Sequence, residues 1–342
     1  MGDRDLYKFV KYNNIYRDVW DAYAGQHDSF FARIVWKEIL EDSFRYESMY
    51  YLIMDEEGKL AGILPLLAGR DIFFRKVAVS LPFIDYVDIC CEKDDIIETA
   101  GDWLRKTAGE NDLHYIELRL LDHRAGILNV MPDESNRSFM MDLKGHAAER
   151  ISGKIYDSDG IFRASFDRER LNDFYRIYSR AQKQKGAPAP GIDFFRRVMQ
   201  RLPDNTHILL VDDAGKKSSS GALFFFSYKD RLYCRWESVL PANDGGSDKI
   251  REFIYREMIR YGLKNGFKLL DLGRTQPGSD SYHIKKRLGA EETALQYCFF
   301  GRGRHSAQEH RKKLLSFAEI WKRLPGFITD PVGKTVIKRL ML

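Results

Sequence analysis

The chain has 342 residues, which predicts about two domains, and 44% of them are apolar, enough to fill two cores. The formal charge is +5, but residues 301–342 hold ten Lys and Arg against three acidic residues, which leaves −2 for residues 1–300 and argues against a broad nucleic-acid groove. The segment MGDRDLYKFVKYNN lacks the apolar run of a secretory signal, and no stretch approaches the ~18 apolar residues of a membrane-spanning helix, so we expect a cytoplasmic protein.

The first half of the chain predicts a helix, a hairpin, a strand, a helix and a strand. A helical stretch around Phe31 to Leu40 leads to YYLIMDEEGKLAGILPLL, which indicates two strands joined by a turn at Glu57-Gly58. A strand then enters a loop in VAVSLPF, a helix follows in IIETAGDWLRKTAGEND, and HYIELR indicates a last short strand.

The second half repeats this order. Its segments are, in turn, DFFRRVMQRL, HILLVDDAGKKSSSGALFFFSY, RLYCRWESVL, IREFIYREMIRYGLKNG and KLLDLGR. The hairpins align at an offset of 157 residues, which places Asp55 with Asp212, and the later elements align at 154, which places Glu117 with Asp271. The chain is therefore predicted to be a duplication, joined by residues 136–162.

We predict an α/β fold of two tandem modules, each a mixed sheet flanked by helices. The first module spans residues 1–150, the second spans 151–300, and a basic amphipathic tail spans 301–342. A cleft is expected between the modules or at the splayed strands of each sheet.

Three groups of segments resemble a known family. The order of elements resembles the GNAT fold, which transfers acyl groups to amines. FYRIYSRAQKQKGAPAPGIDFFRRVM resembles the FemAB pattern of an aromatic helix, a Gly-x-Pro turn and a Phe-rich helix, and LDLGRTQPGSDSYHIKKRLGAE resembles its Asp-x-Gly-Arg strand end followed by Tyr-x-x-Lys-Lys-x-x-Gly. AGILPLL, SLPF and YIELRL resemble FemAB-like proteins found beside exopolysaccharide and exosortase systems.

The resemblance implies an N-acyltransferase with two GNAT-like modules, the first on the acceptor side and the second on the donor side. It implies an amino sugar or lipid-linked cell-envelope glycan as acceptor, with acyl-CoA or acyl carrier protein as donor and no tightly bound cofactor. An aminoacyl-tRNA-dependent peptidoglycan enzyme is the close alternative. It is not favoured, because the coiled-coil insertion that some members use near tRNA is missing and Val87 and Asp88 stand where relatives often have glycines. A non-catalytic, membrane-docked assembly factor for polysaccharide export is the alternative from another class.

The strongest candidate site follows the last strand of the second module. It comprises Asp271, Gly273, Arg274, Tyr282, Lys285 and Lys286. Arg274 offers a planar donor fork suited to carboxylate or phosphate at a strand end, where open sheets collect ligands. The resemblance favours Lys285 as the cation that stabilises the reacting acyl or phosphate end. The alternative is a structural ion pair between Asp271 and Arg274 with solvent-exposed lysines.

Two further candidates lie just before this strand. In PANDGGSDK, Gly245 and Gly246 let the backbone approach a ligand, and Ser247 or Asp248 caps a helix whose N–H groups attract a donor phosphate; an ordinary turn is the alternative. On the preceding strand, Tyr233 and Glu237 are four residues apart, so we predict that they share one face as acid and base. Glu237 as an ordinary strand charge is the alternative.

The first module offers Arg119 and Tyr86 as residues that could line the acceptor side. The eight histidines form no metal-binding spacing, and no metal is expected. The four cysteines lack zinc-type or disulfide-type spacing and are predicted to be buried thiols.

The tail predicts a helix on an anionic membrane surface through residues 305–342, which would make the protein peripheral to the membrane. The alternative is a helix that packs on the body with a solvated basic face. Removal of residues 305–342 is expected to abolish vesicle binding and to leave the body folded.

Overall fold

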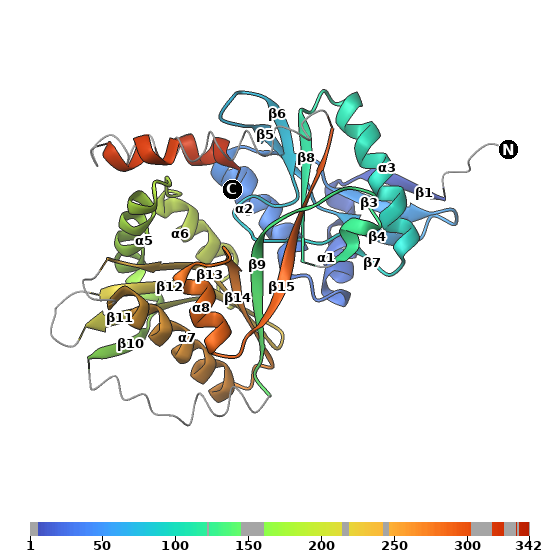
Figure 1. Ribbon diagram of the computed structural model, residues 1–342. Helices are drawn as coiled ribbons and strands as arrows, with labels where there is room; N and C mark the ends of the chain where they lie inside the picture. Colours follow the sequence, from blue (N-terminus) through green and yellow to red (C-terminus); the bar gives the residue numbers. More distant parts are fainter. Residues whose placement is uncertain are drawn as a thin grey trace. The chain divides into compact units, whose positions relative to one another are not determined.

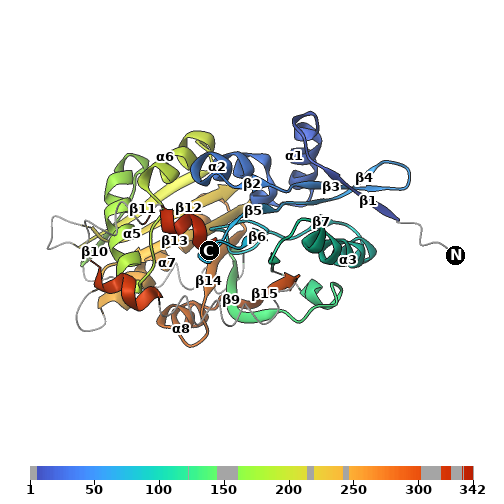
Figure 2. The ribbon, with the colours of Figure 1, turned by 90° about the horizontal axis from the view of Figure 1, so that it is seen from above.

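The computed structural model describes residues 6–121, 123–144, 161–213, 219–241, 246–301, 317–324, 333 and 335–341. They form two compact units, one of residues 1–134, 294–313 and 336–342 and the other of residues 135–293 and 314–335. Figure 1 labels the elements, and Figure 2 shows them from above. Both units are mixed sheets flanked by helices, as the sequence predicts.

The first unit contains two sets of paired strands. One set has the order β1-β3-β4-β7 and the other β15-β8-β6-β5-β2. The strands are β1 (Tyr7–Lys11), β2 (Glu47–Ser48), β3 (Tyr51–Asp55), β4 (Leu60–Leu64), β5 (Leu67–Arg70), β6 (Lys76–Val79), β7 (Cys90–Cys91), β8 (Tyr115–Leu120) and β15 (Glu291–Phe300). The helices are η1 (Asn14–Tyr16), α1 (Arg17–Gln26), η2 (Phe30–Ala32), α2 (Ile34–Phe44), α3 (Asp94–Glu110) and η3 (His123–Gly126), the three η elements being 3-10 helices.

The second unit contains one set of strands with the order β10-β11-β12-β13-β14-β9. These are β9 (Asp133–Asp142), β10 (Phe162–Phe166), β11 (Thr206–Asp213), β12 (Ser219–Tyr228), β13 (Arg231–Val239) and β14 (Leu269–Thr275). The helices are η4 (Arg168–Arg170), α5 (Leu171–Lys185), α6 (Ile192–Arg201), α7 (Gly246–Lys264) and α8 (Asp280–Arg287). Figure 1 shows α5 and α6 on one face of these strands and α7 and α8 on the other.

The two faces of the second sheet are filled differently. An apolar cluster of Leu223, Phe225, Leu232, Cys234 and Leu270 packs against α7. On the other face, Phe174, Phe195, Phe224 and Trp236 pack edge-to-face or tilted, with ring-centroid distances of 5.1 to 5.6 Å. Residues 222–226 of β12, ALFFF, therefore contribute side chains to both apolar layers, because successive side chains of a strand point to opposite faces.

The register of the parallel strands confirms the duplication. In the first unit, Val77 of β6 lies opposite Tyr115 of β8; in the second, Arg231 of β13 lies opposite Leu269 of β14. Val77 and Arg231 are 154 residues apart in the sequence, and so are Tyr115 and Leu269. Helices α3 and α7 also end at equivalent positions, Glu110 and Lys264. The constant offset of 154 residues therefore joins equivalent positions in the two folds and is not only a similarity of sequence.

Two strands do not follow the chain order. Strand β9 precedes the second repeat but pairs with β14 of the second unit, where Met141 lies opposite Leu270. Strand β15 follows the second repeat but pairs with β8 of the first unit, where Cys298 lies opposite Leu118. The predicted modules at residues 1–150 and 151–300 follow the chain, whereas the compact units exchange these two strands.

The described part of the tail is packed rather than free. Within the first unit, the helix at 335–340 buries Ile337 and Leu340, and the Met341 carbonyl accepts a hydrogen bond of 2.7 Å from the buried Arg119. Within the second unit, Trp321 of the helix at 317–323 is 3% exposed. The expectation that the tail can be removed without effect on the body is therefore wrong, because these residues contribute to both cores. Residues 302–316 and 325–332 lie outside the described residues.

No helix within the described ranges is both long enough and apolar enough to cross a membrane.

Removal of residues 336–342 should destabilise the protein strongly. It exposes the pocket filled by Ile337, Leu340 and Met341, each worth roughly 1.5–3 kcal/mol of burial, and it leaves a buried donor of Arg119 without Met341. We expect a fall in Tm of well over ten degrees, measured by circular dichroism. The control neutralises Arg311, Lys312 and Lys313 to Gln at constant length, and an equal loss in that control would contradict this account.

Candidate functional site

Charged and hydroxyl side chains of the second unit gather around Glu237 near the end of β13. Nε of Arg251 on α7 donates to Oε1 of Glu237 at 2.8 Å, and the Tyr255 hydroxyl donates to Oε2. Arg251 and Tyr255 are four residues apart, so they project from the same face of α7. Ser281 at the start of α8 hydrogen-bonds the Tyr255 hydroxyl at 2.8 Å. Hydrogen bonds thus join β13, α7 and α8 at one carboxylate.

A β-bulge in β13 sets the direction of the Glu237 side chain. Phe225 of β12 lies opposite Cys234, but the next residue towards the start of β12, Phe224, lies opposite Trp236. Arg235 is therefore an extra residue in β13. An extra residue interrupts the strict alternation of side chains along a strand.

The bulge corrects one prediction. Tyr233 lies opposite Phe226 on the aromatic face, whereas Glu237 lies opposite Leu223 and faces α7. The prediction that Tyr233 and Glu237 share a face is wrong, because it assumed unbroken alternation. Tyr233 instead shares its face with Trp236, and the phenol that contacts Glu237 is Tyr255.

The surroundings of Glu237 keep it ionised. Burial by itself raises the pKa of Glu237, but the positive charges of Arg251 and Lys285, the hydrogen bond from Tyr255 and the charge of Lys185 outweigh burial and lower the pKa below its usual 4.5. Glu237 is therefore no ordinary strand charge on a solvated edge. It is a carboxylate held by three cations and a phenol.

Two neighbouring groups stay protonated. Burial, followed by the charge of Glu237 and the hydrogen bond to it, raises the pKa of Tyr255 well above 10. Burial, followed by the charge of Asp271, also raises the pKa of the Cys234 thiol. A neutral buried thiol is a poor nucleophile, so this site offers a carboxylate and a phenol and no activated cysteine.

Asp271 forms a buried ion pair, but not with the predicted partner. Its Oδ2 lies 2.6 Å from Nη2 of Arg235, and the two side chains are 2% and 1% exposed. Its Oδ1 accepts a hydrogen bond of 2.7 Å from the backbone N–H of Gly273, which has a φ of 74°. The alternative of an Asp271–Arg274 pair is therefore wrong. The register of β14 shifts between Asp271 and Arg274, and Arg274 is exposed.

Lys285 is buried on the inner face of α8. It is 2% exposed; its Nζ donates to the Gly273 carbonyl at 3.1 Å and to the Thr275 hydroxyl. The ammonium also lies 5.4 Å from the ring centre of Tyr255. The alternative of solvent-exposed lysines is therefore wrong for Lys285, because Lys285 fastens α8 to the end of β14. Its predicted role at the reacting group remains a prediction.

The rest of the predicted cluster lies nearer to solvent. Lys286 is exposed, and its Nζ lies 5.8 Å from the ring centre of Tyr282. The Tyr282 hydroxyl donates to Glu292 at 2.7 Å, and this hydrogen bond raises the pKa of Tyr282. Burial thus separates the adjacent lysines of α8, which makes Lys286 a useful control for Lys285.

The predicted phosphate loop is described only in part. Gly245 lies outside the described residues, and α7 begins at Gly246, so Ser247 and Asp248 lie in its first turn and not at its cap. The Ser247 hydroxyl donates to the Leu240 carbonyl at 3.3 Å, and Asp248 pairs with Arg251 at 2.9 Å. A negative charge in the first turn favours the helix but opposes an anionic ligand.

In the first unit, Arg119 is held by its own fold. It is 4% exposed, its Nε donates to Glu117 at 2.7 Å, and its other nitrogens donate to backbone carbonyls that include Ile84 and Met341. Tyr86 is half-buried in the loop after β6. Arg119 is therefore buried among contacts of its own fold, while Tyr86 remains a predicted acceptor-side residue.

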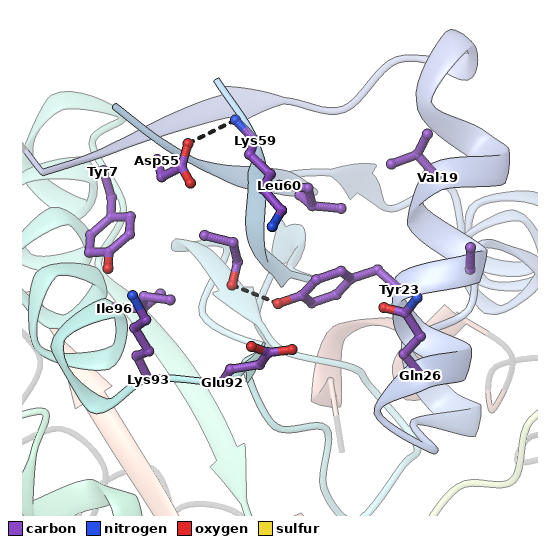
Figure 3. A pocket seen from close by; sticks show the side chains of 12 residues that line it. Tyr7, Val19, Tyr23, Gln26, Asp55, Lys59, Leu60, Glu92, Lys93 and Ile96 are labelled. Atoms are coloured by element: carbon purple, nitrogen blue, oxygen red, sulfur yellow. Dashed lines mark hydrogen bonds between the residues drawn. The ribbon is translucent and has the colours of Figure 1, made fainter. Parts of the chain in front are cut away.

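The first unit also contains a pocket of about 600 Å³ (Figure 3). Lys59 reaches into it from the turn before β4, and Glu92 and Lys93 reach it from the segment before α3. Its wall includes Tyr23, whose hydroxyl donates to the Ala61 carbonyl at 2.6 Å. None of the residues predicted from sequence lines this pocket. Its volume lies within the range of small-molecule sites.

Cysteine and metal chemistry have little structural support within the described ranges. All four cysteines are buried and none forms a disulfide, which confirms the predicted buried thiols. No group of three or more His, Cys, Asp or Glu side chains among the described residues is arranged to hold a metal ion.

Comparisons with known proteins bear on the fold. Residues 156–285 match the model of a family described as the acetyltransferase (GNAT) domain. The solved structure of FemX aligns with 85% of this chain and 96% of its own, with a TM-score of 0.58 at 10% identity. A tandem GNAT protein from the clavulanic acid biosynthesis pathway aligns with 87% of this chain and 99% of its own, with a TM-score of 0.56 at 10% identity.

A third solved structure is the C-terminal domain of a putative lysylphosphatidylglycerol synthetase from Agrobacterium fabrum. It aligns with 78% of this chain and 87% of its own, with a TM-score of 0.50 at 9% identity. A search of curated protein sequences gives no match. Residues 156–285 therefore match the GNAT acetyltransferase domain model, and the structure as a whole has the fold of tandem GNAT proteins. This confirms, at the level of the fold, the resemblance to FemAB-like proteins that its sequence predicts.

Sequence reasoning missed four residues of the site: Arg235, Arg251, Tyr255 and Lys185. Arg251 and Tyr255 lie in α7, where their i, i+4 spacing on an amphipathic helix indicates that they share one face. Lys185 ends α5 and reaches solvent, yet the protein packed around its ammonium lowers its pKa, while the charge of Glu237 opposes that shift. No sequence pattern indicated the bulge that places Arg235.

The ion pair of Arg235 with Asp271 gives a stability test. Arg235→Met leaves a buried carboxylate without its cation, and breaking a buried pair in this way costs roughly 3–5 kcal/mol. Urea denaturation should show that loss. Arg274→Ala removes an exposed side chain and should change the free energy of unfolding by less than about 0.5 kcal/mol. If Arg274→Ala were the more damaging change, the assignment of the pair would be wrong.

Proposed function

We propose that the protein is an N-acyltransferase that uses Glu237 and Tyr255 to exchange protons during acyl transfer. The observation that carries this proposal is a carboxylate with a lowered pKa, hydrogen-bonded to a phenol with a raised pKa. Both lie within the matched GNAT domain. Pairs of titratable groups whose surroundings push their pKa values apart are typical of acid and base roles.

The proposed chemistry needs no covalent enzyme intermediate. The acceptor amine attacks the carbonyl carbon of a thioester, a C–N bond forms, and the adduct carries an acidic ammonium and an oxyanion. Glu237 takes a proton from this ammonium, and Tyr255 gives its proton to the leaving sulfur as the C–S bond breaks. The proton on Glu237 then returns to Tyr255 along their existing hydrogen bond, which restores both groups.

The resemblance and the fold support a choice of donor and acceptor. We propose acyl-CoA or acyl carrier protein as donor and an amino sugar or lipid-linked cell-envelope glycan as acceptor. The likeness to FemX and to a lysylphosphatidylglycerol synthetase domain supports an envelope substrate. The pocket of the first unit supports a polar acceptor, because Lys59, Lys93 and Glu92 offer charges of both signs.

A panel of acyl-CoAs with amino-sugar acceptors, assayed by free thiol release, tests the activity. Transfer from aminoacyl-tRNA alone would favour the peptidoglycan-type alternative. No turnover with thioester or aminoacyl-tRNA donors would favour the non-catalytic assembly factor.

Glu237→Gln should lower turnover at least about 100-fold, because an amide cannot accept the proton, and Tyr255→Phe should lower it similarly. Tyr233→Phe is the matched control and should retain most activity, because Tyr233 lies on the opposite face of β13. Comparable losses in all three variants would contradict the assignment of the pair.

The lowered pKa of Glu237 fixes the sign of its pH dependence. A carboxylate whose folded-state pKa lies below 4.5 stabilises the fold above that pH, and this contribution is lost as pH falls through the folded pKa. Lowering the pH from 7 to about 5 should therefore leave Glu237 ionised. If the wild-type rate already fell with an acidic limb near pH 6 that Glu237→Gln abolishes, this account of its pKa would be wrong.

Lys285→Ala should lower both turnover, by about 100-fold, and Tm. It removes a buried cation that holds the end of β14 and that helps keep Glu237 ionised. The distinguishing measurement is the pH profile: without Lys285 the pKa of Glu237 should rise and the acidic limb should move to higher pH. Lys286→Ala should leave rate, Tm and profile close to the parent. An unmoved profile in Lys285→Ala would reduce its role to packing.

A further inference from the structure

The duplication offers an internal comparison for the hairpin between β5 and β6. In the second unit, the equivalent strands β12 and β13 are joined by only Lys229 and Asp230, and Tyr228 lies opposite Arg231. In the first unit, Arg70 lies opposite Lys76, so five residues form the loop. The turn itself therefore needs only two residues, and the longer loop of the first unit must be explained by something else.

The extra residues expose two aromatic side chains. The loop reads Asp-Ile-Phe-Phe-Arg, and Phe73 and Phe74 are 37% and 63% exposed. They are adjacent, whereas most other large apolar side chains exposed in the described part of the chain lie singly. Single exposed apolar residues are ordinary, but adjacent aromatic residues at a loop tip mark an interaction site.

The loop is rigid and its backbone is strained. Asp71 is buried, and its Oδ1 accepts hydrogen bonds from the backbone N–H groups of Phe73 and Arg75 at 2.9 and 3.0 Å. Phe74 has a φ of 62°, a left-handed conformation that bulky residues rarely adopt. The fold thus keeps an exposed phenylalanine where asparagine or glycine would be less strained.

The charges around the tip are mostly positive. Arg70 donates to the Phe74 carbonyl at 2.9 Å, and the Arg339 guanidinium stacks 3.9 Å from the Phe74 ring centre. With Arg75 and Lys76, these give four cations against the single carboxylate of Asp71. Aromatic residues among cations are typical of segments that sit at the interface of an anionic bilayer, where rings enter the headgroup region and cations meet lipid phosphates.

We propose that the β5–β6 hairpin tip, residues 70–76, docks the protein onto an anionic membrane surface by inserting Phe73 and Phe74. Figure 1 labels both strands of this hairpin. This docking site is centred on the hairpin and not on the tail, which contributes only Arg339 to it. It fits a lipid-linked acceptor but does not depend on the proposed reaction, because vesicle binding is measured without turnover.

The test uses the full chain and cosedimentation with vesicles of phosphatidylcholine containing about one third phosphatidylglycerol. The variant is Phe73→Ser combined with Phe74→Asn, and asparagine suits the left-handed φ, so the fold should be kept or stabilised. We expect binding at least tenfold weaker than the parent's at equal Tm. Parent binding should also weaken as salt rises and on vesicles of phosphatidylcholine alone.

Two controls decide between sources of binding. Ile15→Ser removes an apolar side chain that is 79% exposed elsewhere in the same unit and should bind like the parent. Neutralising Arg311, Lys312 and Lys313 to Gln tests the tail at constant length. Full binding by the Phe73/Phe74 variant together with loss in the tail variant would overturn the proposal in favour of the tail. Failure of the parent to bind either vesicle would also overturn it and would point to a protein partner for the tip.

Discussion

The bulge at Arg235 is the constraint on which the second unit depends. By adding one residue to β13, it points Glu237 at α7 while Arg235 reaches the neighbouring strand and neutralises Asp271. That ion pair fixes the end of β14 beside Gly273, and the Gly273 carbonyl in turn accepts the hydrogen bond of Lys285. An unbulged strand would direct Glu237 to the aromatic face, away from Arg251 and Tyr255.

The fold was largely predictable because duplication is a long-range signal. Each repeat supports the other: a hairpin turn at Gly58 or a helix end at Glu110 is better founded when the same feature returns about 155 residues later. The exchange of β9 and β15 was not predictable. Each of these strands pairs with a strand of the other predicted module, and no local pattern in residues 133–142 or 291–300 indicates that pairing.

The site was predictable only in outline. Glu237, Asp271 and Lys285 were found as residue types at strand ends, but their contacts follow from features that sequence periodicity does not contain. The expectation that side chains alternate strictly along a strand fails at a bulge, so the sequence predicted Tyr233 beside Glu237 where the structure has Tyr255. A lysine side chain is also expected to be exposed to solvent, because lysine is seldom fully buried. Lys285 is buried because the Gly273 carbonyl and the Thr275 hydroxyl compensate its desolvation, and both acceptors come from another element.

The two units keep the same frame and have diverged within it. Glu117 and Asp271 occupy equivalent positions, and each forms a buried ion pair, yet Glu117 uses Arg119 two residues along its own strand and Asp271 uses Arg235 of the neighbouring strand. In the first unit β5 and β6 pair without a register shift, and Arg119 donates to Glu117 and to backbone carbonyls. In the second unit, Arg235 is the extra residue of β13, and Glu237 of the same strand faces α7. A buried carboxylate at this position is therefore paired with an arginine in both repeats, from its own strand in the first and from the neighbouring strand in the second.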